Sequence, residues 1–263
     1  ETARWGSDNQ GADILVGEGQ HLTIAPNFGG PGLGIFGIRY NDKNKNMIRS
    51  TAGRFIGKAK DENGRDCKSI ILATREQHIR REKATSNICS NQSFIASLCG
   101  AALLSRGAEG INDTFKKVHA NTLKLMRDLT TFNGVSLFHS TPVYNEFTIS
   151  IDSSVNDLIK EASLVGIHIG VNVSGRCGVD KELLLISVND KHSEHDLQLL
   201  VNFFGKHFSS GSISETISSI DKKDKRHESF SLPKLSTQDL EDYYKRLGKQ
   251  NLSPDDGIYP LGS

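Results

Sequence analysis

Cysteine, tryptophan and methionine are all scarce in this chain of 263 residues, which has four, one and two of them. The four cysteines lie far apart and follow neither the spacing of a metal site nor that of a disulfide framework: Cys67, Cys89, Cys99 and Cys177. A small secreted protein held together by disulfides is therefore excluded. We expect the reduced, buried thiols of a cytosolic protein.

The sequence also has no marked excess of charge and no long apolar run. Its formal net charge is +1, so no overall field draws it to nucleic acid or to an anionic membrane. We find no stretch typical of a transmembrane helix and no signal peptide. The expectation is a cytoplasmic protein, or a mitochondrial one in a eukaryote, with no nucleic-acid and no membrane partner. Because the first residue is Glu1 and not Met, we expect the chain to be cut from a longer one.

Histidine and acidic residues do not gather into a metal-binding motif. His192 and His195 form an H-x-x-H pair, which is at most half of a metal site, and no further ligand is close in the sequence. We interpret this pair as solvated residues at the start of a helix and expect no metal.

Glycine, in contrast, is abundant and is concentrated between residues 17 and 39. The apolar runs at 13–16 and 33–38 are typical of strands, and the G-G-P-G sequence at 29–32 predicts a tight turn between them. Backbone without side chains can approach a ligand or another chain closely. The alternative is a glycine hairpin within an ordinary sheet, and the spacing of the glycines does not exclude it.

A dinucleotide fingerprint is a further interpretation of these glycines. Gly32, Gly34 and Gly37 match G-x-G-x-x-G, but this fingerprint must open a helix, with an acidic residue following in a βαβ unit. Here the residues after the glycines are typical of a strand. We therefore reject a dinucleotide site at this turn.

A run of mixed charge, T-R-E-Q-H-I-R-R-E-K-A-T-S-N-I-C-S-N-Q, occupies residues 74–92. A basic patch for nucleic acid is one interpretation. The signs alternate, however, and no aromatic residue is interleaved, so a phosphate backbone is a poor partner for it. A solvated charged segment is the usual structure of such a run.

The remaining segments show helix or strand patterns. Residues 60–65, with Asn-Gly, predict a hairpin turn between extended segments at 54–60 and 69–74. The small apolar residues at 94–104 predict a helix buried on all sides. The further expectations are a helix at 107–132, strands at 135–138 and 146–151, a helix at 156–164, strands at 167–173 and 183–188, and a helix at 193–208 with a Ser193 cap. This β-β-α-β-β-α order describes a two-layer α+β domain of about a hundred residues.

Two loops and the end of the chain complete the pattern. The loops at 144–147 and 175–177 look the most functional in the α+β domain, although single polar residues of this kind are more often structural. From Ser209 the composition becomes polar, which predicts a mobile linker over 209–231. A new helix follows, capped by Ser236 or Thr237.

Several stretches resemble one family. A-D-I-L-V-G-E-G-Q with N-F-G-G-P-G-L-G, and the charged run at 74–92, are similar to the amino-terminal half, or alpha subunit, of glycine dehydrogenase (decarboxylating), the P-protein of the glycine cleavage system. The ending D-G-I-Y-P-L-G-S resembles the opening of that family's catalytic half, or beta subunit. The resemblance covers about residues 11–208 and 232–263.

The resemblance implies an α/β fold of the aspartate-aminotransferase-like class of pyridoxal-phosphate-dependent transferases, fold type I. Residues 1–105 are then the rear part of the large domain, and residues 106–208 are the small carboxy-terminal α+β domain. A linker at 209–231 leads to 232–263, the start of the second, catalytic half. A fused gene is expected, with an accidental junction as the alternative.

The resemblance also implies an activity, a cofactor and partners. The family uses pyridoxal 5'-phosphate to decarboxylate glycine and passes the aminomethyl group to the lipoyl arm of H-protein. We expect the partners to be glycine, H-protein and the catalytic half, fused or separate, in a dimer or an alpha2beta2-like assembly. The fragment alone is expected to be inactive. Two alternatives stay open: a non-catalytic scaffold or regulatory half, and another pyridoxal-phosphate-dependent decarboxylase of the same fold.

The family pattern also assigns candidate residues. Gln20 occupies the position of the Schiff-base lysine, and an amide is not a nucleophilic amine. This half is therefore expected to hold no catalytic residue and no covalently bound cofactor, which the other half binds. Thr85, Ser86, Asn87 and Asn91 are expected near the cofactor phosphate or at the dimer interface. The alternative is that residues of this group cap the helix that follows.

The last residues of the chain match the family's active-site loop of the second half. The residues assigned to this loop are Tyr259, Pro260, Leu261, Gly262 and Ser263. A downstream His-Lys pair before another glycine-rich turn would identify an active second half.

Overall fold

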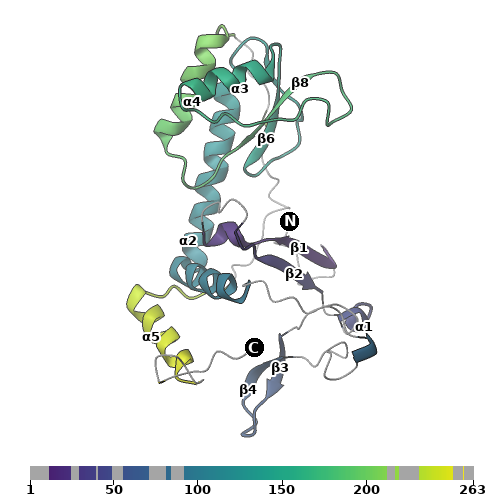
Figure 1. The fold of residues 1–263 in the computed structure, drawn as a ribbon, viewed down its shortest axis with the longest axis vertical. Coiled ribbons are helices and arrows are strands. Elements are labelled where there is room, and N and C mark those ends of the chain that lie inside the picture. The colour runs from purple at the N-terminus through teal and green to yellow at the C-terminus, as the bar shows by residue number, and fades with distance from the viewer. Residues whose placement is uncertain are drawn as a thin grey trace. The chain divides into compact units, whose positions relative to one another are not determined.

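The computed structural model describes residues 12–24, 30–39, 41–48, 56–70, 81–83, 92–211, 217–218, 231–250 and 257 (Figure 1). The chain divides into two compact units. Unit 1 contains Glu1–Ser105 and Lys234–Ser263, and unit 2 contains Arg106–Pro233. Both units contain helices and strands, so the fold mixes α and β structure as predicted.

Unit 1 opens with an antiparallel ribbon around the glycine-rich turn. Strand β1 (Ile14–Glu18) pairs with β2 (Gly34–Ile38). A short 3-10 helix, η2 (Gln20–Leu22), follows β1 almost directly. The two strands predicted beside the turn are thereby confirmed. Residues 25–29 of the turn lie outside the described residues.

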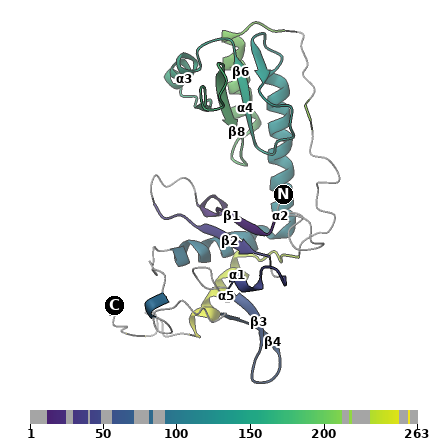
Figure 2. The same cartoon turned by 90° about the vertical axis from the view of Figure 1, so that its right-hand side faces the viewer.

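A second ribbon in unit 1 is formed by β3 (Ile56–Lys60) and β4 (Asp66–Ile70), and Figure 2 shows it from the side. Asp61 stabilises its turn, because Oδ1 accepts hydrogen bonds from two backbone N–H groups of the turn, each at 2.9 Å. Gly64 has a φ of +78°, which is the left-handed conformation that the Asn-Gly pair predicts. The predicted hairpin is confirmed. Unit 1 also contains the short helices α1 (Lys45–Ile48) and η3 (Arg81–Lys83).

Helix α2 (Gln92–Leu129) is interrupted at Gly107, where φ is +63° and ψ is 180°. That combination is open almost only to glycine, so the helix consists of two segments that meet at this residue. The separate helices predicted at 94–104 and 107–132 are thereby confirmed.

The first segment of α2 is less buried than predicted. Up to Ser105, only Ile95 and Cys99 are buried, and Phe94 is 63% exposed. Within this chain the helix is therefore not buried on all sides, and the predicted packing against a partner stays a prediction. Small apolar residues surround the helix, but only one stripe, in which the residues are spaced by one helical turn, is covered.

By length and composition, α2 could cross a membrane, and it is the one such helix in the described part of the chain. The prediction that the chain contains no stretch typical of a transmembrane helix does not account for α2. A single helix of this kind is a weak indication of a membrane span, because the core helices of soluble proteins meet the same test.

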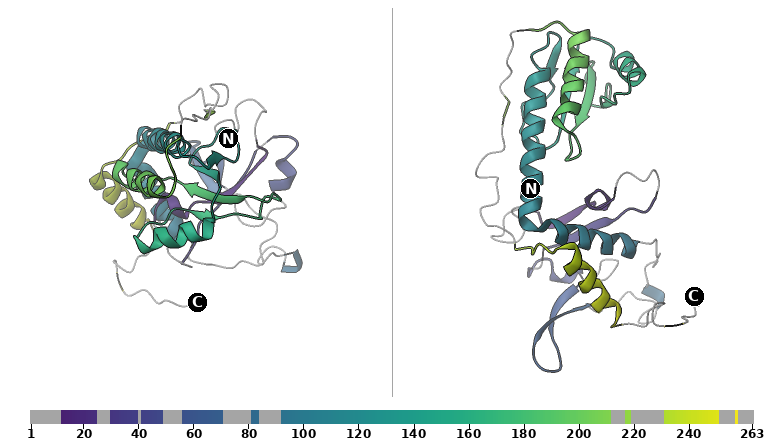
Figure 3. Two further views of the ribbon diagram at one scale, coloured as in Figure 1. Left: turned by 90° about the horizontal axis from the view of Figure 1, so that it is seen from above. Right: turned by 90° about the vertical axis from the view of Figure 1, so that its left-hand side faces the viewer.

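Unit 2 combines an antiparallel sheet with helices. The sheet has the strand order β5-β6-β8-β7, and its elements follow the predicted β-β-α-β-β-α order. The bounds are β5 (Val135–Leu137), β6 (Glu146–Ile151), α3 (Val155–Leu164), β7 (Val171–Asn172), β8 (Glu182–Ser187) and α4 (Glu194–His207). Helix α4 runs beside the second segment of α2 (Figure 3), and Lys124 Nζ on α2 lies 3.1 Å from Glu194 Oε1.

One hydrophobic core joins the sheet of unit 2 to its helices. Along β6, Phe147, Ile149 and Ile151 are buried and alternate with more exposed residues, which is the pattern of a strand covered on one face. The second segment of α2, together with α3 and α4, adds fully buried side chains to the same cluster, among them Leu129, Val155 and Phe204.

Strand β7 is much shorter than the strand predicted at 167–173. Gly170, directly before β7, has a φ of +145°, and a Cβ at this position would collide with the backbone carbonyl of Leu185. The backbone passes β8 here in a conformation that only glycine tolerates. Regular pairing therefore begins only at Val171.

The start of the predicted linker is hydrogen-bonded within unit 2. The backbone N–H of Gly211 donates to the carbonyl of Thr131 at 2.7 Å, and the N–H of Asn133 donates to the carbonyl of Ser209 at 2.9 Å. These bonds hold the first linker residues to the turn after α2, so a linker can begin only after Gly211. Most of residues 212–230 lie outside the described part of the chain.

Two of the described helices begin with a serine capping box. Ser193 forms a capping box with Asp196 at α4, and Ser236 forms one with Asp239 at α5 (Thr237–Gly248). The serine hydroxyl and backbone N–H donate to the carboxylate in each box, which lowers the pKa of Asp196 and of Asp239. The predicted cap at Ser193 is confirmed, and Ser236 is the one used at α5.

The described thiols are free. Cys99 is buried and its burial raises the pKa of the thiol, whereas Cys177 is exposed. The expectation of buried thiols holds for Cys99, is met only in part at the half-buried Cys67, and is wrong for Cys177. Cys89 lies outside the described residues.

Candidate functional site

The glycine-rich turn is closed by a carboxylate. Glu18 Oε1 accepts hydrogen bonds from the backbone N–H groups of Gln20 and Leu33, each at 2.7 Å. The N–H of Gly19 donates to the carbonyl of Leu33, also at 2.7 Å. We call Glu18, Gln20 and Leu33 the turn clamp. The N–H donors, that of Leu33 first and that of Gln20 second, lower the pKa of the Glu18 carboxyl.

Two glycines give the turn clamp its room. A Cβ at Gly32 would lie 3.0 Å from Glu18 Oε2, and a Cβ at Gly19 would lie 3.0 Å from the Cδ1 atom of Ile35. These distances are shorter than ordinary carbon contacts, so larger residues would displace the carboxylate or the isoleucine. At these two glycines the bare backbone is approached by Glu18 and Ile35 of the same chain. The alternative of a glycine hairpin within an ordinary sheet predicts such contacts.

Gln20, which the resemblance assigns to the family's lysine position, takes part in the same turn. It is the first residue of η2 and half-buried, and its Nε2 donates to the carbonyl of Ile24 at 3.1 Å. Its backbone N–H is held by Glu18. The side chain therefore stabilises the local turn. Its amide nitrogen has no lone pair free for attack on a carbonyl carbon.

The other predicted site residues cannot be placed by the structure. Thr85, Ser86, Asn87 and Asn91 lie outside the described residues, so both alternatives, a phosphate contact and a helix cap, stay predictions. The same is true of the active-site loop expected at the end of the chain, which comprises Tyr259, Pro260, Leu261, Gly262 and Ser263.

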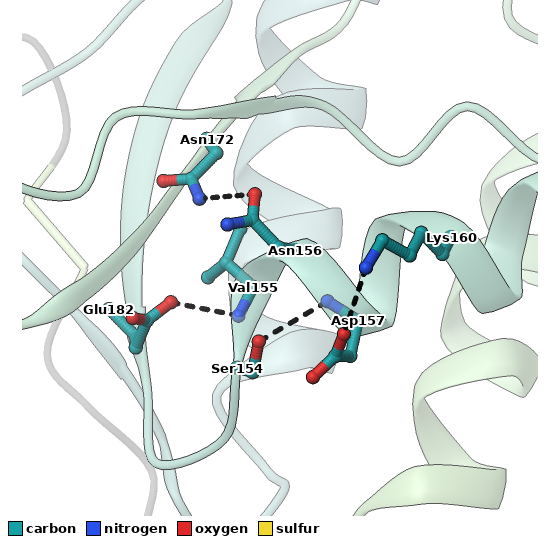
Figure 4. A network of polar contacts seen from close by, with 7 residues as sticks. All are labelled: Ser154, Val155, Asn156, Asp157, Lys160, Asn172 and Glu182. Carbon is teal, nitrogen blue, oxygen red and sulfur yellow. Dashed lines mark hydrogen bonds and ion pairs between the residues drawn. The ribbon is translucent and has the colours of Figure 1, made fainter.

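A polar network that local sequence patterns did not predict surrounds the start of α3 (Figure 4). Glu182, on β8, accepts a hydrogen bond from the backbone N–H of Val155 at 2.9 Å, and the Ser154 hydroxyl accepts one from the N–H of Asp157 at 3.3 Å. Two of the free N–H groups of the first helical turn are thereby satisfied. Because Glu182 follows Val155 by 27 residues, the pattern of the helix alone gave no signal for this cap.

The same network extends to β7 and along α3. Asn172 Nδ2 donates to Asn156 Oδ1 at 2.8 Å, and Lys160 Nζ lies 3.3 Å from Asp157 Oδ1. The Ser154 hydroxyl, and then Lys160, lower the pKa of Asp157. In these contacts each donor is paired with an acceptor, and the network holds α3 against the sheet. Its role is structural.

Tyr144, in one of the loops that the sequence singled out, belongs to an aromatic stack. Its ring lies 4.4 Å from that of Phe115 between centroids, with an angle of 6° between the planes. Its backbone carbonyl lies 3.2 Å from His119 Nδ1, so this nitrogen donates when it carries the proton. Burial, and secondly the charge of Asp190, raise the pKa of the Tyr144 phenol, which is therefore neutral at physiological pH.

The described residues contain a surface hollow but no metal cluster. The hollow, of about 440 Å³, is lined by one side of α5 with the residue before its cap: Leu235, Asp239, Asp242, Tyr243 and Arg246. Asp239 already serves the capping box. Among the described residues no group of three or more His, Cys, Asp or Glu side chains could hold a metal ion. His192, of the H-x-x-H pair, accepts a hydrogen bond from the backbone N–H of Asn189 at 3.0 Å.

Comparison with known proteins gives a consistent result. Residues 6–204 match the family described as "Glycine cleavage system P-protein". The chain is 37% identical over 195 residues to a "Probable glycine dehydrogenase (decarboxylating) subunit 1" from Chlorobium phaeobacteroides, covering 74% of this chain and 42% of the relative. It is 39% identical over 194 residues to the protein of the same description from Chlorobaculum parvum, with the same two coverages. The chain thus spans about two fifths of the length of these curated relatives.

A solved structure shows the same similarity. The structure described as "Crystal structure of glycine decarboxylase (P-protein) of the glycine cleavage system, in inhibitor-bound form" is 31% identical in sequence and superposes with a TM-score of 0.63. The match covers 74% of this chain and 43% of that chain. The family match includes the turn clamp and the whole sheet of unit 2, and it ends before α5.

Proposed function

The chain belongs to the glycine cleavage system P-protein family, and from this premise we propose that it supplies the rear part of the non-catalytic, amino-terminal half of a glycine decarboxylase. The observation that carries the proposal is Gln20. Family similarity assigns this position to the lysine of the catalytic half, and here a glutamine amide hydrogen-bonds to its own turn.

The proposed whole enzyme decarboxylates glycine and transfers the aminomethyl group to the lipoyl arm of H-protein. Its cofactor is pyridoxal 5'-phosphate, which when bound withdraws electrons from the bond between the α-carbon and the carboxylate. The residues at the turn do not fit covalent attachment of that group. We assign the covalent anchor to the catalytic half, as a separate subunit or a later part of the same chain.

The residues of this chain have a supporting role in the proposal. The turn clamp keeps the ends of β1 and β2 together, and Gln20 keeps the lysine position free of a competing amine. For the residues at 85–87 and for Asn91, which lie outside the described residues, the proposed role is contact with the cofactor phosphate or the subunit interface. The loop at 259–263 opens the catalytic half.

The domain assignment follows the same premise. We propose that unit 1 holds the rear of the large domain of a fold type I enzyme together with the start of the catalytic half. Unit 2 is then the small carboxy-terminal domain. The similarity to a solved glycine decarboxylase, at a TM-score of 0.63, supports this assignment. The proposed assembly is a dimer or alpha2beta2-like, in the cytoplasm, or in mitochondria if the source is a eukaryote.

The test is reconstitution with a catalytic half. Residues 6–204 of this chain replace the matching segment in the alpha subunit of a two-subunit relative. This chimaera is co-expressed with the beta subunit, and release of labelled carbon dioxide from carboxyl-labelled glycine is measured with cofactor and lipoyl H-protein. We expect release from the pair and none from either protein alone. Release by this chain alone would overturn the non-catalytic role. A pair that forms a stable complex but releases nothing would contradict the decarboxylase proposal in favour of a scaffold.

A further inference from the structure

Helix α5 lies beyond the part of the chain that matches the family, yet it belongs to unit 1. The match ends at residue 204, and α5 spans Thr237–Gly248. The helix therefore packs with residues that precede it by more than one hundred positions. The contacts that achieve this are few and specific.

The break in α2 leaves two backbone groups without their helical partners. In an uninterrupted helix the N–H of Ala108 would donate to the carbonyl of Leu104. Instead the N–H of Ala108 donates to the carbonyl of Leu232 at 3.1 Å, and the carbonyl of Leu104 accepts from the N–H of Leu235 at 2.9 Å. The segment before α5 thus satisfies both groups that the conformation of Gly107 exposes.

A tyrosine makes the third contact. Tyr244 Oη, on α5, donates to the carbonyl of Ser97 at 2.7 Å. A Cβ at Gly100, one turn further along α2, would lie 3.5 Å from the same hydroxyl oxygen. Glycine therefore leaves the approach to the Ser97 carbonyl open, while a larger side chain at this position would obstruct it. The neighbouring Tyr243 lines the hollow on α5.

Helix α5 has no fully buried residue, and Leu240 and Tyr244 are half-buried, so apolar burial contributes only modestly to its attachment. The Ser236 capping box starts the helix independently of α2. A pre-formed helix with so little buried surface among the described residues should detach locally at small cost. It should also be sensitive to the loss of any one of the segment's hydrogen bonds to α2.

We propose that the first segment of α2, from Ser97 to Leu104, is a docking site for the segment 235–248 within unit 1. Resting on the proposed function, this segment is the first helix of the catalytic half, so the site is where the non-catalytic half holds its partner. Recognition depends on the carbonyls of Ser97 and Leu104, and the carbonyl of Leu104 is available because Gly107 interrupts the helix.

Hydrogen–deuterium exchange of the whole chain, followed by mass spectrometry, tests the site directly. Tyr244→Phe removes one neutral hydrogen bond and should speed exchange in α5 about fivefold. Tyr243→Phe, the matched control on the adjacent residue, should leave exchange unchanged. Equal exchange in the two variants would overturn the role of Tyr244.

A second pair of variants tests the break itself. Gly107→Ala cannot keep the observed conformation without strain, so the helix should straighten and the Ala108 N–H should return to the Leu104 carbonyl. Protection of α5 should then fall to that of an unattached helix. Gly205→Ala, at a helical glycine of α4 where an added Cβ would make only ordinary contact with Phe132, is the control and should preserve it. Protected amides in β6 and β8 verify that each variant is folded, and a folded Gly107→Ala chain with a protected α5 would refute the docking site.

This experiment is independent of glycine chemistry. If α5 is released as expected but the reconstituted pair liberates no carbon dioxide, the docking site stands and the proposed function fails. If the variants leave exchange in α5 unchanged while the reconstituted pair liberates carbon dioxide, the docking site fails and the proposed function stands.

Discussion

The carboxylate of Glu18 and the backbone N–H of Leu33, 15 residues later in the chain, are joined by a hydrogen bond of 2.7 Å. The bond connects the end of β1 to the residue before β2 across a turn rich in glycine. Because the same oxygen also accepts from the backbone N–H of Gln20, this one carboxylate also holds the start of η2.

Protonation of Glu18 should loosen this turn. The pKa of Glu18 is lowered in the folded protein, so its contribution to stability is present above the unfolded-state value of about 4.3 and is lost as the pH falls through the lower folded-state value. Amide exchange at Gln20 and Leu33, corrected for the intrinsic pH dependence, should therefore become faster on acidification. In Glu18→Gln that pH dependence should be absent, and exchange should already be faster at neutral pH. Glu62→Gln, at an exposed turn residue, is the control; a wild-type pH dependence retained in Glu18→Gln would contradict the assignment.

No covalent cofactor adduct is expected on this chain. The purified protein is mixed with pyridoxal 5'-phosphate, its absorbance spectrum is recorded, and borohydride reduction is followed by peptide mapping. Because Gln20 supplies no amine, no lysine should be modified at stoichiometric yield. A single lysine that is fully labelled would show that this half does carry an anchor.

Thr85→Val in the full enzyme separates the two roles predicted for residues 85–87. If the hydroxyl donates to the cofactor phosphate, affinity should fall about ten- to a hundredfold, because a hydrogen bond to a charged group contributes roughly 1.5–3 kcal/mol. If it caps a helix, stability should fall by about 1 kcal/mol and affinity should stay constant. The melting midpoint of the apoenzyme and the cofactor dissociation constant are the two measurements. A change in melting alone would remove Thr85 from the site.

Gly170→Ala should destabilise unit 2 strongly. The substitution adds a Cβ that collides with the carbonyl of Leu185 to a backbone conformation that itself costs about 1–3 kcal/mol for other residues. Gly178→Ala is the matched control, since Gly178 has a φ of +67° but open space around it. Urea unfolding should show a larger loss of free energy for Gly170→Ala than for the control. Equal losses would mean that strain alone acts at both positions.

Local patterns predicted most elements because each pattern has a physical cause close in sequence. The alternation at 146–151 gave the observed bounds of β6, and Ser193 with Asp196 gave the start of α4. Gly166, at a φ of +76°, ends α3 where the sequence placed the end of that helix.

The misses depend on contacts between residues far apart. The collision that requires Gly170 involves Leu185 on another strand, and the cap of Val155 comes from Glu182. Neither of these two contacts produces a periodic pattern in the sequence. At the candidate site, a family motif rather than local chemistry pointed to Gln20, and no pattern pointed to the role of Glu18. The polar residues at 85–87 lie outside the described part of the chain.

The break at Gly107 also imposes an order on folding during translation. The ribosome releases Leu104 and Ala108 long before Leu232 and Leu235, so the exposed carbonyl and N–H must at first be hydrated. Pairings between such distant residues form late, because a long loop must close first. A nascent chain arrested after α4 would therefore carry an open, water-bonded joint in α2, and this joint would mature only when residues 232–235 leave the exit tunnel.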